Sequence, residues 1–123
     1  MRVLVVDDNP ILASTLGRWV RSFGHETLLA RGPEEALTLL DKNVDAVISD
    51  IEMPVMSGLD LARVIRQRHA DMPIAFCSGS EPDGDTRTAL GEIGPFLTKP
   101  WLPEDLAQVL VLLGGQVSIR LAS

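Results

Sequence analysis

Five side chains that could do chemistry follow short apolar runs in this sequence: Asp7, Asp8, Asp50, Ser78 and Lys99. If the runs are neighbouring strands, three carboxylates, a hydroxyl and an ammonium converge. Close carboxylates repel and raise one another's pKa values, and a divalent cation relieves that conflict. Mg²⁺ fits such a site best, because it takes carboxylate and carbonyl oxygens while keeping several waters, and Mn²⁺ is the second choice. The pattern predicts a magnesium site with the ammonium group of Lys99 beside it.

Each of these residues also has an ordinary structural explanation. Asp8 or the neighbouring Asn9 could cap a following helix, and Ser78 is typical of a turn. Lys99 is more informative, because only two of the 11 basic residues are lysines. A compact ammonium suits a single phosphoryl or carboxylate oxygen, whereas arginine offers a wide fork. The shared position after apolar runs carries more weight than any single residue.

Alternating strand and helix patterns predict how these side chains are brought together. Near-continuous apolar runs, typical of strands covered on both faces, lie at 3–6, 27–30, 46–48, 74–77 and, more weakly, 96–97. Helical apolar spacing covers 11–23, 33–40, 58–70 and 103–113, with a weak helix near 82–90. This alternation predicts an α/β domain with a parallel sheet, right-handed crossovers and helices on both faces. Function in such sheets lies at the carboxyl ends of the strands.

Composition narrows the class of protein. The chain has 123 residues and a formal net charge of −6, which is not the electrostatic footprint of a nucleic-acid binder. Cys77 is the only cysteine, so an internal disulfide is excluded. No apolar run reaches the roughly 20 residues of a membrane span. We expect a soluble cytoplasmic domain over residues 1–113, with 114–123 a tail or the start of a linker.

Four stretches, taken in order, carry a family resemblance: 5–9 (Val-Val-Asp-Asp-Asn), 48–58 (Ile-Ser-Asp-Ile-Glu-Met-Pro-Val-Met-Ser-Gly), 77–79 (Cys-Ser-Gly) and 96–100 (Phe-Leu-Thr-Lys-Pro). On them the chain resembles a response-regulator receiver domain over about residues 2–113. The resemblance implies a flavodoxin-like fold with five parallel strands in the order 2-1-3-4-5 and five helices. Four matches in the right order are far more specific than an acidic pair alone.

The resemblance also implies a role for each matching acidic position. Asp50 matches the phosphate acceptor. Asp8 matches the direct magnesium ligand, with Asp7 acting mostly through water, and the backbone carbonyl of Glu52 matches a further ligand. Glu52 and Ser80 occupy the two positions that tune phosphate lifetime in this family.

The remaining motif positions match phosphate contacts and a conformational switch. Ser78 and Lys99 match the residues that contact the phosphoryl group. The Lys99–Pro100 peptide bond matches one that is usually cis, which proline makes accessible. Ser78 and Phe96 match a pair in which the hydroxyl moves toward the phosphoryl group and an aromatic ring follows it inward.

These implications describe a two-component phosphorelay module rather than a metabolic enzyme. We expect Asp50 to accept a phosphoryl group from a phosphohistidine of a sensor kinase or phosphotransfer protein. Self-catalysed transfer and autodephosphorylation would be its only reactions, and the fourth helix, fifth strand and fifth helix would control an output partner or form a homodimer. We expect no direct contact with nucleic acid or membrane.

Three alternatives stay open at this point. A haloacid-dehalogenase-like phosphohydrolase also uses an aspartate after a strand, and Glu52 could mimic its general acid. A flavodoxin-like carrier would need a phosphate loop where Asp7-Asp8 stands, which would repel that phosphate. A degenerate receiver would be used only for binding.

Several side chains outside the motif carry expectations of their own. Trp19 lies on the apolar stripe of the first helix and is predicted to be core, whereas Trp101 is predicted to pack its loop onto the last helix. Arg66 is predicted to lie on a solvated helix face with its arginine neighbours. The polar segment 81–86 predicts a fourth helix that is mobile until activated.

Overall fold

Five parallel strands form the centre of the structure, a computed structural model that describes residues 1–114. The strands are β1 (Arg2–Val6), β2 (Glu26–Ala30), β3 (Ala46–Asp50), β4 (Ile74–Ser78) and β5 (Phe96–Thr98). They pair in the order β2-β1-β3-β4-β5, and every pairing is parallel. The predicted fold class and strand order are confirmed. Apart from Gly114, the expected tail at 114–123 lies outside the described residues.

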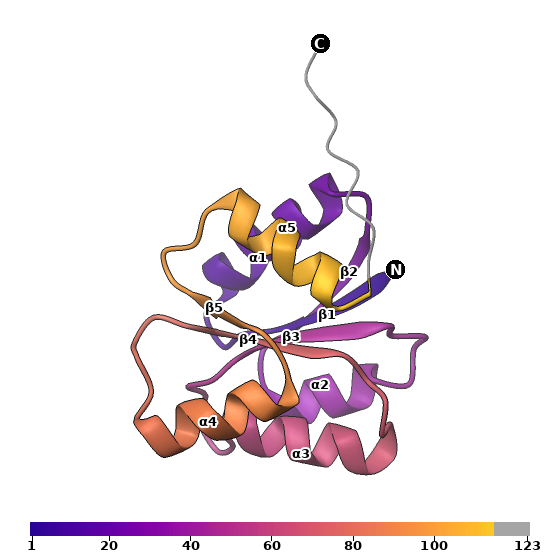
Figure 1. The fold of residues 1–123 in the computed structure, drawn as a ribbon. Coiled ribbons are helices and arrows are strands. Elements are labelled where there is room, and N and C mark those ends of the chain that lie inside the picture. The colour runs from indigo at the N-terminus through magenta and orange to yellow at the C-terminus, as the bar shows by residue number, and fades with distance from the viewer. Residues whose placement is uncertain (115–123) are drawn as a thin grey trace.

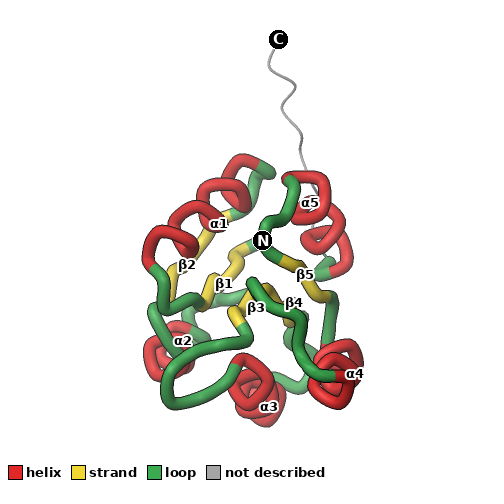
Figure 2. The backbone as a smooth tube through the Cα atoms, turned by 90° about the vertical axis from the view of Figure 1, so that its left-hand side faces the viewer, coloured by secondary structure: helices red, strands yellow, loops and turns green. Residues whose placement is uncertain are grey.

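Five helices cover the two faces of this sheet (Figures 1 and 2). α1 (Pro10–Ser22) and α5 (Pro103–Leu112) lie on one face. α2 (Pro33–Leu39), α3 (Gly58–Arg68) and α4 (Gly84–Ile93) lie on the other. The central strands β1, β3 and β4 therefore have a helix layer above and below them, which explains why they are mostly apolar and buried, whereas the edge strands β2 and β5 are partly exposed.

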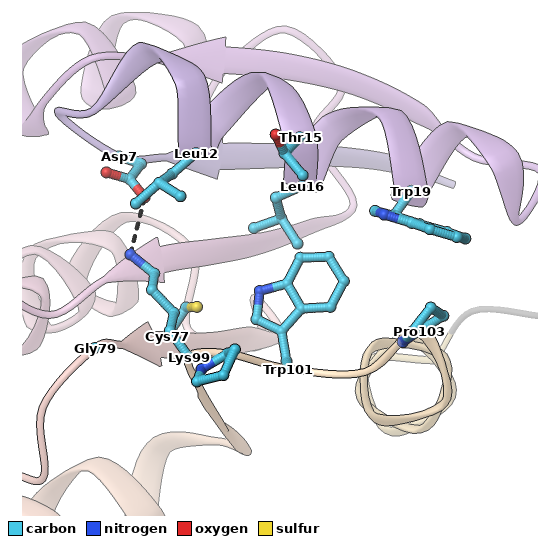
Figure 3. Close-up of a pocket in the computed structure, with 11 residues that line it drawn as sticks. Asp7, Leu12, Thr15, Leu16, Trp19, Cys77, Gly79, Lys99, Trp101 and Pro103 are labelled. Carbon is cyan, nitrogen blue, oxygen red and sulfur yellow. Dashed lines mark hydrogen bonds and ion pairs between the residues drawn. The ribbon is translucent and has the colours of Figure 1, made fainter.

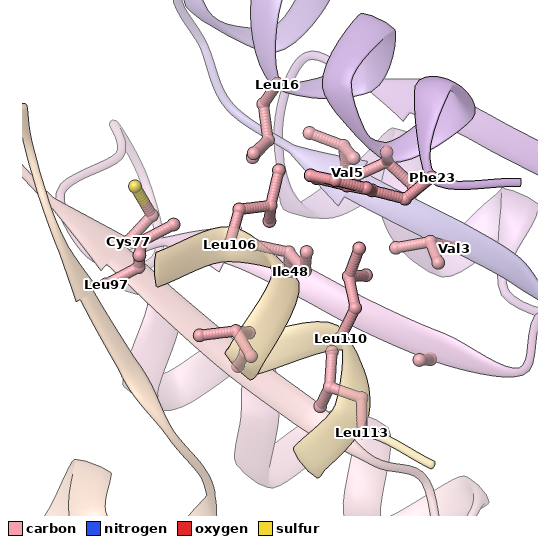
Figure 4. Close-up of a cluster of buried hydrophobic side chains, with 14 of the residues drawn as sticks. Val3, Val5, Leu16, Phe23, Ile48, Cys77, Leu97, Leu106, Leu110 and Leu113 are labelled. Carbon is pink, nitrogen blue, oxygen red and sulfur yellow. The ribbon is translucent and has the colours of Figure 1, made fainter. Parts of the chain in front are cut away.

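Two apolar layers separate the sheet from its helices. Successive residues of a strand point to opposite faces, so Val5 packs toward α1 and α5 while Leu4 packs toward α2 and α3. Figure 4 shows the first layer, where Leu106 and Leu110 of α5 meet Val5 of β1. All four of these side chains are fully buried. Both layers pack against the strands that lead to the expected site.

Local capping sets where the helices begin near the expected site. The Asn9 side chain accepts hydrogen bonds from the backbone N–H of Ile11 (3.0 Å) and Leu12 (3.2 Å). Asn9, and not Asp8, is therefore the cap of α1. The Asp83 carboxylate caps α4 in the same way, accepting from Thr86 N at 2.8 Å, and these bonds hold the pKa of Asp83 below its usual value.

Two expectations about side-chain burial were wrong. Trp19 is 40% exposed, because α1 turns Ala13, Leu16, Gly17 and Val20 toward the sheet and leaves the edge of its wide apolar stripe uncovered. Arg66 is partly buried, whereas its neighbours Arg63 and Arg68 are exposed as expected. Its guanidinium donates to the carbonyl oxygens of Met72 (2.7 Å) and Ile93 (3.1 Å) and so ties α3 to the end of α4.

Candidate functional site

Three carboxylates meet at the carboxyl edge of the sheet. Asp7 and Asp8 follow β1, and Asp50 ends β3, which pairs with β1. One oxygen of each lies within 4.8 Å of the others. Asp7 and Asp50 are buried, whereas Asp8 is exposed. The cluster is therefore open to solvent on the side of Asp8 and enclosed on the side of the two buried acids.

Lys99 reaches these carboxylates from the far edge of the sheet. Its Nζ lies 3.3 Å from Asp7 Oδ2 and 3.8 Å from Asp50 Oδ2. The peptide bond that follows, Lys99–Pro100, is cis. Burial alone would lower the pKa of Lys99, but the charges of Asp50 and Asp7 outweigh it and raise that pKa. The side chain is consequently a firmly charged ammonium between two buried acids.

The surroundings of Asp50 have opposing effects on its pKa. Burial raises its pKa, Lys99 opposes that rise, and the nearby charge of Asp7 adds to it, so the net shift is upward. The backbone N–H of Glu52 donates to Asp50 Oδ1 at 3.3 Å. With all three acids ionised, one ammonium leaves the cluster with an excess of two negative charges. Carboxylate oxygens with that excess fit a hard divalent cation.

Two serine hydroxyls lie at and just after the end of β4, the strand that pairs with the Asp50 strand β3. Ser78, at the end of β4, is buried, and its Oγ donates to the Ser80 carbonyl at 2.8 Å and accepts from Ser80 N at 3.2 Å. The Ser80 hydroxyl in turn donates to the Glu52 carboxylate. The two residues expected to tune phosphate lifetime therefore contact each other, on the solvent side of Ser78.

Phe96 lies away from the cluster, at the start of β5 next to β4. Its ring is half-buried, and the Arg87 guanidinium of α4 lies over it, with Cζ 4.2 Å from the ring centroid. Sequence reasoning missed Arg87. In the sequence, Arg87 is marked only as a basic residue in a helical segment with few apolar residues. Its spacing along the chain does not indicate which aromatic ring it contacts.

An apolar cavity of about 570 Å³ lies next to Lys99, between α1 and the loop that leads into α5 (Figure 3). Leu16 and Trp19 line it from α1, and Trp101 lines it from the loop. Trp101 is half-buried against the apolar layer of α1 and α5. Cys77 also lines it, and burial raises the pKa of its thiol to about 12. Cys77 is therefore a protonated, small apolar residue rather than a nucleophile.

Comparisons with known proteins agree on one family. The family model described as "Response regulator receiver domain" matches residues 3–111. A "Chemotaxis protein CheY homolog" of Campylobacter jejuni is 33% identical and matches over 89% of each chain. The "Positive alginate biosynthesis regulatory protein" of Pseudomonas aeruginosa is 34% identical over all of this chain, which covers 51% of that relative. This chain spans about half or less of the length of several relatives.

Solved structures give the same result. The crystal structure of a response regulator receiver protein from Pseudomonas putida superposes with a TM-score of 0.82 at 34% identity, covering 89% of this chain and 94% of that one.

Among the helices of residues 1–114, none is long and apolar enough to cross a membrane.

Proposed function

The chain belongs to the response regulator receiver domain family, and on that basis we propose that it is a phosphorelay switch whose acceptor is Asp50. The observation that carries this proposal is the buried Asp50 carboxylate, within ion-pair distance of Lys99 and clustered with Asp7 and Asp8. A nucleophilic carboxylate beside a fixed cation suits acyl phosphate formation. The donor would be a phosphohistidine of a sensor kinase or of a histidine phosphotransfer protein.

The transfer requires the ionised form of Asp50. A carboxylate oxygen of Asp50 forms the new bond to phosphorus while the bond from phosphorus to the donor imidazole nitrogen breaks, and that nitrogen keeps the electron pair. Lys99 lies close enough to both buried acids to contact a transferred phosphoryl oxygen. Once its hydrogen bonds to Ser80 are broken, the Ser78 hydroxyl would donate a hydrogen bond to the same phosphoryl group.

The acidic cluster fits a magnesium ion. Asp8 and Asp50 would hold it directly together with the Glu52 carbonyl, and Asp7 mostly through water. When bound, the ion supplies positive charge that offsets the phosphoryl oxygens and the excess negative charge of the carboxylates. Asp7 also has a structural role. Its Oδ1 accepts a hydrogen bond from Asn9 N at 2.9 Å, which connects the end of β1 to the N-cap residue of α1.

Hydrolysis would end the signal, and Glu52 and Ser80 would set its rate. Both residues are exposed and hydrogen-bonded to each other, and Ser80 also contacts the buried Ser78 hydroxyl, so a water that approaches the phosphoryl group from solvent would pass them. We expect the module to act in the cytoplasm. The surface that would report phosphorylation is formed by α4, β5 and α5, and it would control an output partner or domain, or form a homodimer.

Intact mass spectrometry with acetyl phosphate tests the proposal. Wild-type protein with Mg²⁺ should gain the mass of one phosphoryl group, and Asp50→Asn should not. Asp60→Asn is a matched control, because Asp60 is an exposed acid on α3 that pairs with Arg63 and is not one of the three clustered carboxylates. Label that persists in Asp50→Asn would refute Asp50 as the acceptor. If neither phosphoryl transfer nor beryllofluoride binding is detected, the chain is a receiver used only for binding.

A phosphohydrolase is separated from a switch by turnover. Such an enzyme would release phosphate from a generic phosphomonoester over many cycles, with Glu52 as the proton donor. The Glu52 carboxylate instead accepts a hydrogen bond from Ser80. We expect acetyl phosphate to label the protein and a phosphomonoester to give no multiple-turnover release.

A further inference from the structure

Arg87 contacts the proposed switch ring. Its guanidinium carbon lies 4.2 Å from the centroid of Phe96, within the range of a cation–π interaction. Arg87 lies on α4 and Phe96 on β5, so the contact joins two elements of the proposed output surface. A ring that rotates inward must leave this contact.

The same guanidinium also contacts the loop between β4 and α4. Arg87 Nη1 donates to Glu81 Oε1 at 3.1 Å. Glu81 directly follows Ser80, which is hydrogen-bonded to both Ser78 and Glu52. One arginine therefore connects the loop beside the acidic cluster to the ring that lies away from it.

We propose that Arg87 is a positioning residue that holds Phe96 in its half-exposed position and, through Glu81, makes that position depend on the β4–α4 loop. This inference rests on the proposed function. In the unphosphorylated protein the loop is held by the bonds among Ser78, Ser80 and Glu52. A movement of Ser78 toward a phosphoryl group breaks those bonds, shifts Glu81 and draws the guanidinium off the ring.

The expected size of the effect is modest. The pair of Arg87 and Glu81 is exposed, with 46% and 70% of the side chains accessible, so the ion pair by itself contributes little. An exposed cation–π contact shifts an equilibrium by about two- to fivefold. If Arg87 stabilises only the resting arrangement, its removal should tighten the binding of an activating ligand by that factor. The conformational change then costs less free energy, and less of the intrinsic binding free energy is lost to it.

The test uses beryllofluoride with Mg²⁺ as a phosphoryl mimic and 4-fluorophenylalanine as a reporter. The chain has three phenylalanines, and Phe96→Leu assigns the Phe96 ¹⁹F resonance by its loss. Tryptophan fluorescence, to which Trp101 and Trp19 of the cavity beside Lys99 both contribute, measures the apparent Kd. The variants are Arg87→Ala, Arg87→Lys and Glu81→Gln. The control is Arg63→Ala, which removes a similar exposed pair with Asp60 on α3.

We expect the Phe96 resonance of free Arg87→Ala to move toward its beryllofluoride-bound position and the apparent Kd to fall about two- to fivefold. Arg87→Lys should restore most of the wild-type behaviour, Glu81→Gln should move both readouts partway, and Arg63→Ala should move neither. An unchanged resonance and Kd in a folded Arg87→Ala would overturn the inference, as would weaker binding. If Arg87→Ala does not fold, Glu81→Gln decides by the same two readouts. If wild-type protein binds no beryllofluoride, the proposed function fails instead, and the two failures are distinct.

Discussion

Replacing Gly58 with alanine should damage both the stability and the chemistry of this protein. Gly58 is the first residue of α3 and lies directly against the acceptor strand, where its N–H donates to the Ile51 carbonyl at 2.8 Å. A Cβ at this position would lie 2.2 Å from the Asp50 carbonyl oxygen and 2.9 Å from Ile51 Cα. Both contacts are with backbone atoms, so no side-chain rotation relieves them.

The size of the effect follows from that overlap. Separating these atoms to ordinary contact moves the start of α3, or the end of β3, by roughly 1 Å. Overpacking of a rigid core costs about 3 kcal/mol when backbone must shift, which corresponds to a Tm lower by roughly 10 °C. A displacement of about 1 Å in a reacting group costs roughly 100-fold in rate, so labelling of Asp50 by acetyl phosphate should slow by that factor.

A matched control makes the same substitution elsewhere. Gly91 is exposed on α4, and a Cβ there would meet no heavy atom within 4 Å. Gly91→Ala should therefore stabilise the protein by about 0.5–1 kcal/mol, because glycine in a helix interior is unfavourable relative to alanine. Its labelling rate should equal that of wild type.

The assay is thermal unfolding followed by circular dichroism, combined with the rate of mass gain in acetyl phosphate. Gly58→Ala with a wild-type Tm would refute the argument from close approach. A lower Tm with an unchanged labelling rate would show that the contact stabilises the fold but does not position Asp50.

Further outcomes follow from the charges of the site and from the packing of α4. Mg²⁺ at about 100 times its Kd should stabilise the protein by about 2.7 kcal/mol in urea unfolding, and Asp8→Asn should abolish most of that gain. Burial raises the pKa of Asp50, so the folded state binds more protons than the unfolded one and loses stability as pH rises through the interval between the two pKa values. Without metal, Asp50→Asn should therefore have a larger free energy of unfolding than wild type at neutral pH but not in acid. The same difference in free energy of unfolding at both pH values would contradict the argument from burial. Lys99→Met should destabilise the metal-free protein by about 1–3 kcal/mol, because two buried carboxylates lose the ammonium that neutralises them. A urea unfolding midpoint equal to that of wild type would contradict this. Amide hydrogen exchange should be faster in α4 than in α1, since Leu90 is the only buried residue of α4, and equal protection would contradict the expected mobility.

Much of the architecture is readable from the residues. Strands buried on both faces need continuous apolar runs, so β1, β3 and β4 were recognisable without knowledge of their neighbours. Polar residues after such runs must share one edge of a parallel sheet. Asp7, Asp50 and Lys99 could therefore be placed together from the chain order and the motifs.

Other features depend on contacts between distant elements. The apolar stripe of α1 is wider than the surface that the sheet and α5 cover, so periodicity predicted burial for Trp19 where the structure leaves it 40% exposed. Arg66 looked like a surface charge, yet carbonyl groups at Met72 and Ile93 accept its hydrogen bonds. Which carbonyls end near an arginine is set by how α3 and α4 pack, and no local pattern records it.

The residues by themselves determined which side chains carry the chemistry, because strand ends and local motifs are encoded over a few neighbouring positions. Tertiary structure alone decided how those side chains interact. It set the contact of Arg87 with Phe96 and the hydrogen bond of Ser80 with Glu52. Helical spacing and alternation describe which face of an element is apolar, whereas side-chain contacts across elements depend on packing angles and distances that arise only when the layers meet.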